Sequence, residues 1–334
     1  MTQGARPGPT DEEAELRRLL AGKRCLLVAS TGGHLAQLVR WSQLFRVHED
    51  SVFATFDSPQ SRSLLTGRRV VLLDYVPPRG ARQAVAATAR LARRTRGARF
   101  DAVLTTGAAV SLAAYAVSRL RRIPIVYIES VSRFDGPSAT GRILERLPGV
   151  RRFSQHRAWA GRAGWRLGPS LLDDYTASPR AVAPAPATPG RSVFVSLGTI
   201  RPYRFDALVD AVRDQLRPED EVTWQVGVTD RSDLPGRSSA EVDAEAFDRL
   251  VAESDVFITH AGVGTLLRAL ELGVRPVVVP RRSTRGEHVD DHQLQVAREL
   301  ADRGLVLLRE PDELSSADFE PADVSIARAT DTQA

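Results

Sequence analysis

The sequence predicts an α/β protein with two doubly wound, parallel-sheet domains. Short apolar segments alternate with helix-length segments along most of the 334 residues, which is the pattern of a parallel sheet covered by helices on both faces. A proline- and alanine-rich run at 181–190 interrupts the alternation, which then restarts. Such a run sustains neither helix nor strand and is typical of an interdomain linker. The length also suits two domains of ordinary size.

Runs of apolar and β-branched residues predict the strands of the first half, and the spacers between them have helical periodicity. The predicted strands are 24–30, 51–55, 69–73, 102–105 and 125–128. The predicted helices are 34–44, 80–95, 109–120 and 138–147. These elements form the first domain, 23–172, which follows an N-terminal extension, 1–22.

The second half repeats the pattern after a linker that we place at 173–190. Its predicted strands are 192–196, 221–226, 256–259, 276–279 and 306–308. Its predicted helices are 205–215, 243–253, 263–271 and 290–303. The second domain therefore spans 191–315, and the acidic stretch 316–334 is predicted to be a disordered tail.

Composition narrows the functional classes. The net charge is only +5, and Lys23 is the only lysine, so the arginine bias reflects genome composition rather than nucleic-acid binding. Cys25 is alone, which excludes a disulfide framework and favours a reducing compartment. No apolar segment is long enough to span a bilayer, and residues 1–15 do not resemble a signal peptide. We expect a cytoplasmic location.

Polar loops follow the predicted strands in both domains, where a doubly wound sheet binds its ligand. They are 30–34 and 129–133 in the first domain, and 196–199, 260–265 and 287–293 in the second. We expect these loops to line a cleft between the domains. The helix starts after Gly33 and Gly262 offer free N–H groups to phosphate oxygens, so the expected ligand is a nucleotide diphosphate.

The motifs resemble a known group of enzymes. Segments 30–34, 105–107, 127–133 and 138–141 are similar to the acceptor subunit of the eukaryotic enzyme that adds the second N-acetylglucosamine to dolichol diphosphate. Segments 195–199, 259–264 and 286–293 resemble its catalytic donor subunit. The chain is also similar to bacterial exopolysaccharide and capsule glycosyltransferases, whose halves are usually separate proteins, and more distantly to the peptidoglycan enzyme that glycosylates lipid-linked muramyl pentapeptide.

The resemblance implies a fused, inverting glycosyltransferase of the GT-B family 28 type. It implies a UDP-sugar in the second domain, as a substrate rather than a cofactor. It also implies a polyprenyl-diphosphate-linked or other glycan acceptor at a first domain that associates with the inner face of the cell membrane. No acidic metal-binding motif follows a strand of the first domain. We therefore expect no metal, and expect helix N-termini and arginines to stabilise the departing diphosphate.

The family's donor residues transfer unevenly. Gln293 matches the glutamine that binds the sugar hydroxyls, since an amide both donates and accepts hydrogen bonds. Arg268 stands where relatives of the peptidoglycan enzyme carry a glutamate for the ribose, so ribose recognition stays unassigned. The full predicted donor set is Ser196, Gly198, Thr199, His260, Gly262, Val263, Gly264, Thr265, Glu287, His288, Asp291, His292 and Gln293.

Two residues are candidates for the general base. His34 follows the first strand, and an imidazole with a pKa near 6.5 accepts a proton at neutral pH. Glu129 is the competitor, and it could instead orient His34, hold an acceptor hydroxyl, or cap or pair with Arg133. His34 could equally be a helix-start residue without chemistry. The acceptor-side loop residues are Thr31, Gly32, Gly33, Ser130 and Arg133.

Several alternatives stay open. Residues 288–292 could hold a metal, but consecutive residues at a helix start rarely converge on one ion. The segment 81–96 is amphipathic, so its arginines contact either solvent or anionic lipid headgroups, together with those at 119, 121 and 122. The rival functions are a nucleotide-sugar epimerase, a non-catalytic binding subunit, and an NAD-dependent oxidoreductase, for which Gly32 and Gly33 supply only a fragment of the fingerprint.

Overall fold

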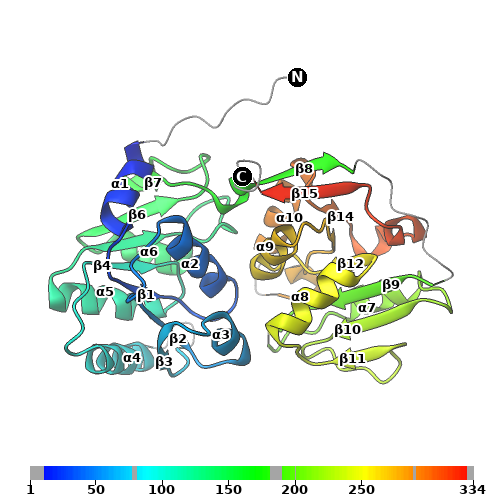
Figure 1. Cartoon of the computed structure of the whole chain (residues 1–334), viewed down its shortest axis with the longest axis horizontal. Helices are drawn as coiled ribbons and strands as arrows, with labels where there is room; N and C mark the ends of the chain where they lie inside the picture. The colour runs from blue at the N-terminus through cyan, green and yellow to red at the C-terminus, as the bar shows by residue number, and fades with distance from the viewer. Residues whose placement is uncertain (1–10, 77–80, 181–189, 200, 289–290, 329–334) are drawn as a thin grey trace. The chain divides into compact units, whose positions relative to one another are not determined.

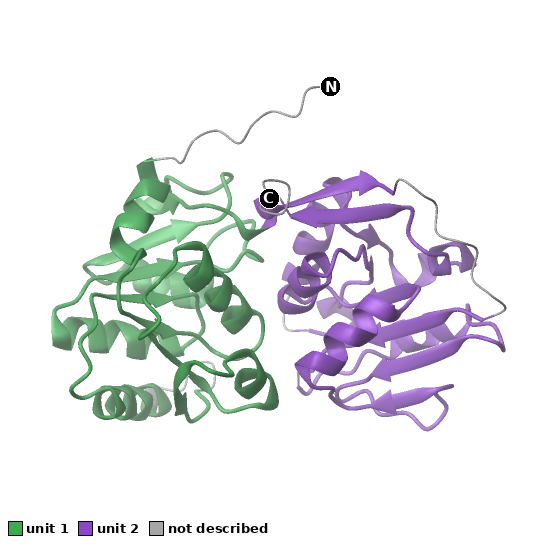
Figure 2. Cartoon of the chain, viewed as in Figure 1, with its two compact units in different colours: residues 1–171 green, residues 172–334 purple. Residues whose placement is uncertain are grey.

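A computed structural model describes residues 11–76, 81–180, 190–199, 201–288 and 291–328. The chain forms two compact units, Met1–Leu171 and Leu172–Ala334 (Figures 1 and 2). The boundary lies beside the predicted end of the first domain at 172. Each unit has its own parallel sheet covered by helices, as the alternating pattern predicts.

The first unit contains a seven-stranded parallel sheet in the order β3-β2-β1-β4-β5-β6-β7. Its strands are β1 (Cys25–Val28), β2 (Val52–Phe56), β3 (Arg69–Leu73), β4 (Ala102–Thr105), β5 (Ile125–Ile128), β6 (Val150–Ser154) and β7 (Arg166–Leu167). The order reverses between β1 and β4. In an open α/β sheet this switch point, at the carboxyl ends of the strands, is where ligands bind.

The α-helices of the first unit include two that the sequence did not predict, α1 and α3. They are α1 (Asp11–Leu20), α2 (Gly33–Leu44), α3 (Pro59–Leu64), α4 (Ala81–Arg94), α5 (Val110–Arg121) and α6 (Ala139–Glu145). The expectation that residues 1–22 lie outside the first domain is wrong for α1. Leu16 and Leu20 are fully buried on one face, and Glu15 pairs with Arg151 and Arg166.

The second unit contains a six-stranded parallel sheet in the order β11-β10-β9-β12-β13-β14. Its strands are β9 (Ser192–Ser196), β10 (Glu221–Gln225), β11 (Arg237–Ser239), β12 (Val256–Thr259), β13 (Val277–Val278) and β14 (Leu307–Leu308). Its helices are α7 (Asp206–Arg213), α8 (Ala244–Glu253), α9 (Val263–Glu271) and α10 (His292–Asp302). Here the order reverses between β9 and β12, which defines a second switch point.

A separate two-stranded antiparallel sheet changes the predicted linker and tail. β8 (Tyr175–Pro179) pairs with β15 (Val324–Arg328), and the two strands lie side by side in Figure 1. The first strand lies in the predicted linker, and the second in the stretch predicted to be disordered. Both are too short and too polar to be predicted alone, and each exists because the other satisfies its backbone. Residues 181–189, most of the proline-alanine run, lie outside the described residues.

Candidate functional site

His34 lies at the switch point of the first sheet, in the first turn of α2 directly after β1. Its Nδ1 is 2.8 Å from the carbonyl oxygen of Thr106, which follows the adjacent strand β4. The Thr106 hydroxyl donates in return to the carbonyl oxygen of His34, at 2.8 Å. Because a carbonyl oxygen only accepts hydrogen bonds, Nδ1 carries a proton, and in the neutral ring the lone pair is therefore on Nε2. This tautomer suits a general base.

Gly107 makes room for this ring. It has φ 131°, and a Cβ at this position would lie 2.6 Å from Cε1 of His34. Glycine is therefore required both by the backbone conformation and by the ring. The sequence placed His34 in a candidate site, but gave no indication that Gly107 packs against it.

Glu129, the other candidate base, is fully buried, and both of its carboxylate oxygens accept hydrogen bonds. One carboxylate oxygen accepts hydrogen bonds from the Tyr127 hydroxyl and the Ser130 N–H, and the other from the N–H and hydroxyl of Ser138. Burial raises the pKa of Glu129, and the hydrogen bonds from Ser138, Ser130 and Tyr127 oppose the rise. Gly141 packs directly against the carboxylate. Glu129 therefore organises the turn between β5 and α6, where Ser138 caps the helix.

A buried pair of amides, which no local sequence pattern indicates, holds the predicted acceptor loop. Gln37, one turn after His34, donates to the Ser130 hydroxyl at 3.0 Å and accepts from the Val131 N–H at 2.9 Å. Gln155 donates to Gln37 and to the carbonyl oxygen of Glu129. The helix that carries His34 is thus tied to the loop that carries Ser130.

The remaining predicted acceptor residues fall into the same two loops. Thr31, Gly32 and Gly33 form the turn into α2, where the N–H of Gly32 donates to the Gln60 side chain at 2.9 Å. Arg133 lies farther along the 129–133 loop. These residues are therefore brought together within the first unit.

His260 occupies the equivalent place at the second switch point. It follows β12, is 7% exposed, and packs between two glycines. A Cβ at Gly198 would lie 2.5 Å from Cε1 of its ring, and one at Gly262 would lie 2.8 Å from the same atom. Burial and, as a smaller effect, the charge of Arg281 together lower the pKa of His260 to about 3, although a hydrogen bond to the backbone of Ser196 opposes them. The imidazole is neutral at physiological pH.

The start of α9 is suited to a phosphate. Gly262 is its N-cap and has no side chain to satisfy the first N–H groups, which belong to the turn containing Val263, Gly264 and Thr265. Such uncapped N–H groups at the positive end of a helix dipole bind anions. Ser196, Gly198 and Thr199, at the end of the neighbouring strand β9, complete this part of the predicted donor set.

The segment before α10 is held by its own side chains. Glu287 accepts hydrogen bonds from Arg282 and Arg285, and Asp291 accepts from the Ser283 N–H. The His288 ring stacks on the Tyr203 ring, with 5.9 Å between the ring centroids. It meets the His292 ring edge-to-face, with 4.7 Å between the centroids. Residues 289 and 290 lie outside the described residues.

Gln293 is 4% exposed, and its side-chain oxygen accepts from the backbone N–H of Arg281 at 3.3 Å. Its predicted contact with the sugar stays a prediction.

Arg268 of α9 pairs with Asp248 of α8 and with Glu271 of its own helix. The pair with Asp248 joins the two helices. The charge of Arg268 is neutralised there, so it fits a role in packing two helices together. Arg281, which the sequence analysis did not single out, donates to backbone carbonyl oxygens of two predicted donor loops, at Leu197 and Glu287.

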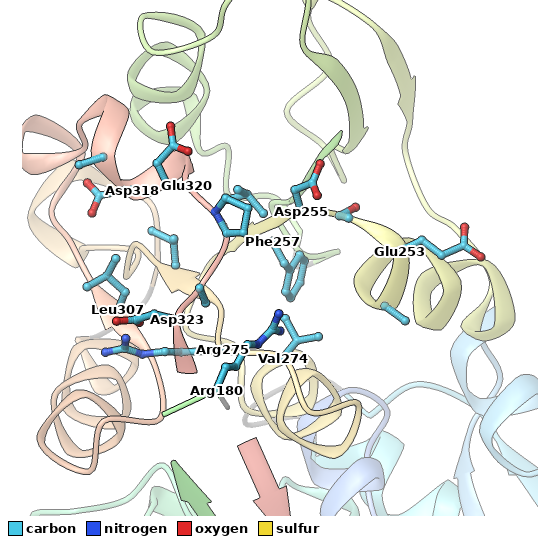
Figure 3. Close-up of a pocket in the computed structure, with 17 residues that line it drawn as sticks. Arg180, Glu253, Asp255, Phe257, Val274, Arg275, Leu307, Asp318, Glu320 and Asp323 are labelled. Carbon is cyan, nitrogen blue, oxygen red and sulfur yellow. The ribbon is translucent and has the colours of Figure 1, made fainter. Parts of the chain in front are cut away.

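A cavity of about 460 Å³ lies at the opposite, amino-terminal edge of the second sheet (Figure 3). Carboxylates dominate its charged lining, which consists of Glu253, Asp255, Asp318, Glu320, Asp323, Arg180 and Arg275. Such a surface repels a diphosphate, so this cavity is not the donor site. Within the described part of the chain, no group of three His, Cys, Asp or Glu could hold a metal ion, and no helix is long and apolar enough to cross a membrane.

The low pKa of His260 predicts an acid-sensitive fold. The folded protein keeps the ring neutral down to about pH 3, whereas the unfolded chain protonates it near 6.5. The unfolded state therefore binds one more proton between these values, and this residue lowers the free energy of unfolding by up to about 1.4 kcal/mol per pH unit as pH falls. Urea denaturation between pH 7 and 4 should show a steeper loss for the wild type than for His260→Asn. Parallel curves would contradict the assignment.

Comparisons with known proteins agree with this geometry. Residues 193–317 match the glycosyltransferase family 28 C-terminal domain. No curated protein matches the chain. Among solved structures, MurG of Acinetobacter baumannii is 16% identical over 88% of both chains, with a TM-score of 0.51. SnogD of Streptomyces nogalater is 22% identical over 88% of this chain and 89% of its own, with a TM-score of 0.54. SsfS6 of Streptomyces sp. SF2575, complexed with thymidine diphosphate, is 16% identical over 89% of this chain and 90% of its own, with a TM-score of 0.52. The predicted fold is confirmed, and the predicted resemblance to family 28 is confirmed for residues 193–317.

Proposed function

We propose that this chain, which is a glycosyltransferase of the GT-B, family 28 type, transfers a hexose from a UDP-sugar to a lipid-linked or membrane-borne glycan acceptor during polysaccharide biosynthesis, with inversion at the anomeric carbon. The observation that carries the proposal is the second switch point. There a neutral histidine between two glycines lies beside an uncapped helix start. This arrangement suits a diphosphate, which every nucleotide-diphosphate sugar contains.

In the proposed donor site, the N–H groups at the start of α9 bind the diphosphate and stabilise the charge that develops as it departs. This stabilisation acts without a metal ion. The neutral imidazole of His260 adds hydrogen-bonding capacity without adding charge. Gln293 is the second residue of α10, and in this proposal its side-chain amide binds the sugar hydroxyls.

In the proposed acceptor site, His34 takes the proton of the attacking hydroxyl. The hydroxyl oxygen forms the new bond to the anomeric carbon while the bond to the diphosphate breaks, which is a single displacement with inversion. The lone pair on Nε2, fixed by the hydrogen bond at Nδ1, supports this role. The buried, fully bonded Glu129 is better suited to organising the loop beside it.

The base of the nucleotide needs a separate test. SsfS6 was solved with thymidine diphosphate, and Arg268 in this chain gives no carboxylate for a ribose hydroxyl. We expect UDP to bind more tightly than TDP, measured by isothermal titration calorimetry on the full chain. Tighter binding of TDP would change the donor class but leave the diphosphate site intact. Binding of neither nucleotide would overturn the proposal.

Gln293→Ala tests whether the Gln293 side chain contributes to binding of the sugar but not of the nucleotide. We expect turnover with the UDP-sugar to fall by about tenfold, because hydrogen bonds to the sugar are lost, while the affinity for UDP stays within about twofold. Calorimetry gives the UDP affinity, and steady-state kinetics give the turnover. An equal loss of both would contradict the assigned role.

A truncated donor unit for such work should begin at 172 and so keep β8, rather than near 189.

The proposed membrane contact depends on α4. Ala87 and Leu91 pack into the core, whereas Val85 is 70% exposed because it lies off that stripe. Two predicted headgroup ligands have other partners. Arg90 pairs with Asp74, and the Arg121 side chain donates to Thr95 and two backbone carbonyls. The exposed arginines of the patch are Arg82, Arg93, Arg94, Arg96, Arg119 and Arg122.

Reversing Arg82, Arg93 and Arg94 to glutamate should weaken binding to anionic vesicles by about 1 kcal/mol for each charge. Vesicle co-sedimentation at low and physiological salt measures this loss. The matched control reverses Arg237, Arg249 and Arg298, three exposed arginines of the second unit. If both triple variants bind vesicles equally well, α4 is a solvated helix.

A further inference from the structure

Arg281 is the most buried cation near the proposed donor site. It follows β13 and is 1% exposed. Its guanidinium donates four hydrogen bonds, all to backbone carbonyl oxygens. The acceptors are Leu197 at 2.6 Å, Arg204 at 3.0 Å, Tyr203 at 3.1 Å and Glu287 at 3.2 Å. One side chain therefore joins the 197–204 stretch, 77 to 84 residues away in the sequence, to the segment before α10.

Two of the four carbonyl acceptors, those of Leu197 and Glu287, lie beside or within the predicted donor set. Leu197 precedes Gly198, which packs against His260, and Glu287 precedes His288. The backbone N–H of Arg281 itself donates to Gln293. Moving this arginine would therefore shift the phosphate-binding turn and the sugar-binding glutamine together.

The Arg281 guanidinium donates to no carboxylate of the described residues. None of the ion pairs found among the described residues includes it, although the Glu287 carboxylate attracts it at longer range. The guanidinium instead lies over the Phe205 ring at 4.6 Å. Burial lowers the pKa of Arg281 to about 10, so the group stays charged at neutral pH. Burying an uncompensated cation is costly, and a nearby ligand anion offsets that cost.

We propose that Arg281 is the positioning residue of the donor site, holding the loops at 197, 203–204 and 287 in register and supplying a buried positive charge that favours the diphosphate. The inference rests on the proposed function of the second switch point. Arg281 does not touch the ligand; it acts through the loop that contains Leu197 and Gly198. The positive charge of Arg281 favours binding of a negatively charged diphosphate over binding of a neutral nucleoside.

Two substitutions separate charge from geometry. Arg281→Met removes both, while Arg281→Lys keeps the charge but cannot reproduce the planar fork that reaches four carbonyls. Calorimetry with UDP on the full chain should show an affinity lowered by about tenfold to a hundredfold in Arg281→Met, with Arg281→Lys in between. The KM for the UDP-sugar should rise with it, while the KM for the acceptor should change less than twofold.

Arg191 provides a matched control in the same unit. It is also 1% exposed and lies over an aromatic ring, but it pairs with Asp220 at 2.5 Å, away from the donor loops. Arg191→Met should lower stability, measured by urea denaturation, and leave UDP affinity of the folded protein unchanged. This result excludes a general effect of losing a buried arginine.

The outcomes are distinct. Failure of the wild type to bind any nucleotide diphosphate refutes the proposed function, and the inference with it. If the wild type binds UDP and folded Arg281→Met binds it within twofold, the proposed function stands and the inference is wrong. If Arg281→Met does not fold, Arg281→Lys decides: wild-type affinity and donor KM refute the positioning role, and a several-fold loss of both supports it.

Discussion

His34→Ala should lower turnover by about 10²-fold or more, with donor affinity unchanged. The substitution removes the Nε2 lone pair that accepts the acceptor proton, and general base catalysis typically contributes a factor of this size. Donor binding should be spared because the proposed phosphate-binding turn belongs to the other unit. The measurements are kcat at saturating donor and acceptor, and UDP affinity by calorimetry.

Two variants test this assignment from different sides. Gly107→Ala keeps the imidazole of His34 but displaces it, because the new methyl group meets the ring. Turnover should therefore fall in this variant too. Glu129→Gln should cost less turnover than His34→Ala, although it lowers stability because the amide N–H₂ faces the donors of Ser138. If Glu129→Gln abolishes turnover while His34→Ala retains it, Glu129 is the base.

Gly262→Ala should cost about 1–3 kcal/mol of stability and at least tenfold in UDP affinity. The new methyl group would lie 2.8 Å from Cε1 and 3.0 Å from Cδ2 of the His260 ring. The ring has no space to retreat, because Gly198 lies against it as well. Either the imidazole or the start of α9 must move, and both belong to the proposed phosphate site. Urea denaturation and calorimetry measure the two losses.

A double-mutant cycle identifies the cause. With His260→Ala in the background, the Gly262 methyl group has no ring to meet, so Gly262→Ala should become nearly neutral for stability. An unchanged penalty in that background would show that the ring is not what restricts position 262.

The sequence predicted most of the fold because buried parallel strands are apolar along their whole length. β3, β4, β5, β9 and β12 have the predicted bounds. β6 was missed because Arg151 and Arg152 interrupt its apolar run; Arg152 instead donates to the carbonyl oxygens of Leu144 and Glu145. α1 was missed because its acidic first turn outweighed the two leucines that it buries.

Candidate site residues could be identified from the sequence where a short motif contains them, and were missed where their partners are distant in the sequence. His260 stood out because glycines surround it in the sequence. Arg281 did not, because its carbonyl partners at 197, 203 and 204 are 77 to 84 residues away and one arginine among many carries no local signal. Gln37 was hidden for the same reason, since its partner Ser130 is 93 residues away.

The pairing of β8 with β15 has a practical consequence. Among the described residues, β15 is the only hydrogen-bonded neighbour of β8. A chain shortened at 315 would leave β8 as an open edge strand, with a row of unsatisfied N–H and C=O groups. Such an edge is a template for the same strand of a second molecule. Shortened versions that lack 324–328 should therefore self-associate, and the few residues that look most dispensable in the sequence keep this protein from aggregating.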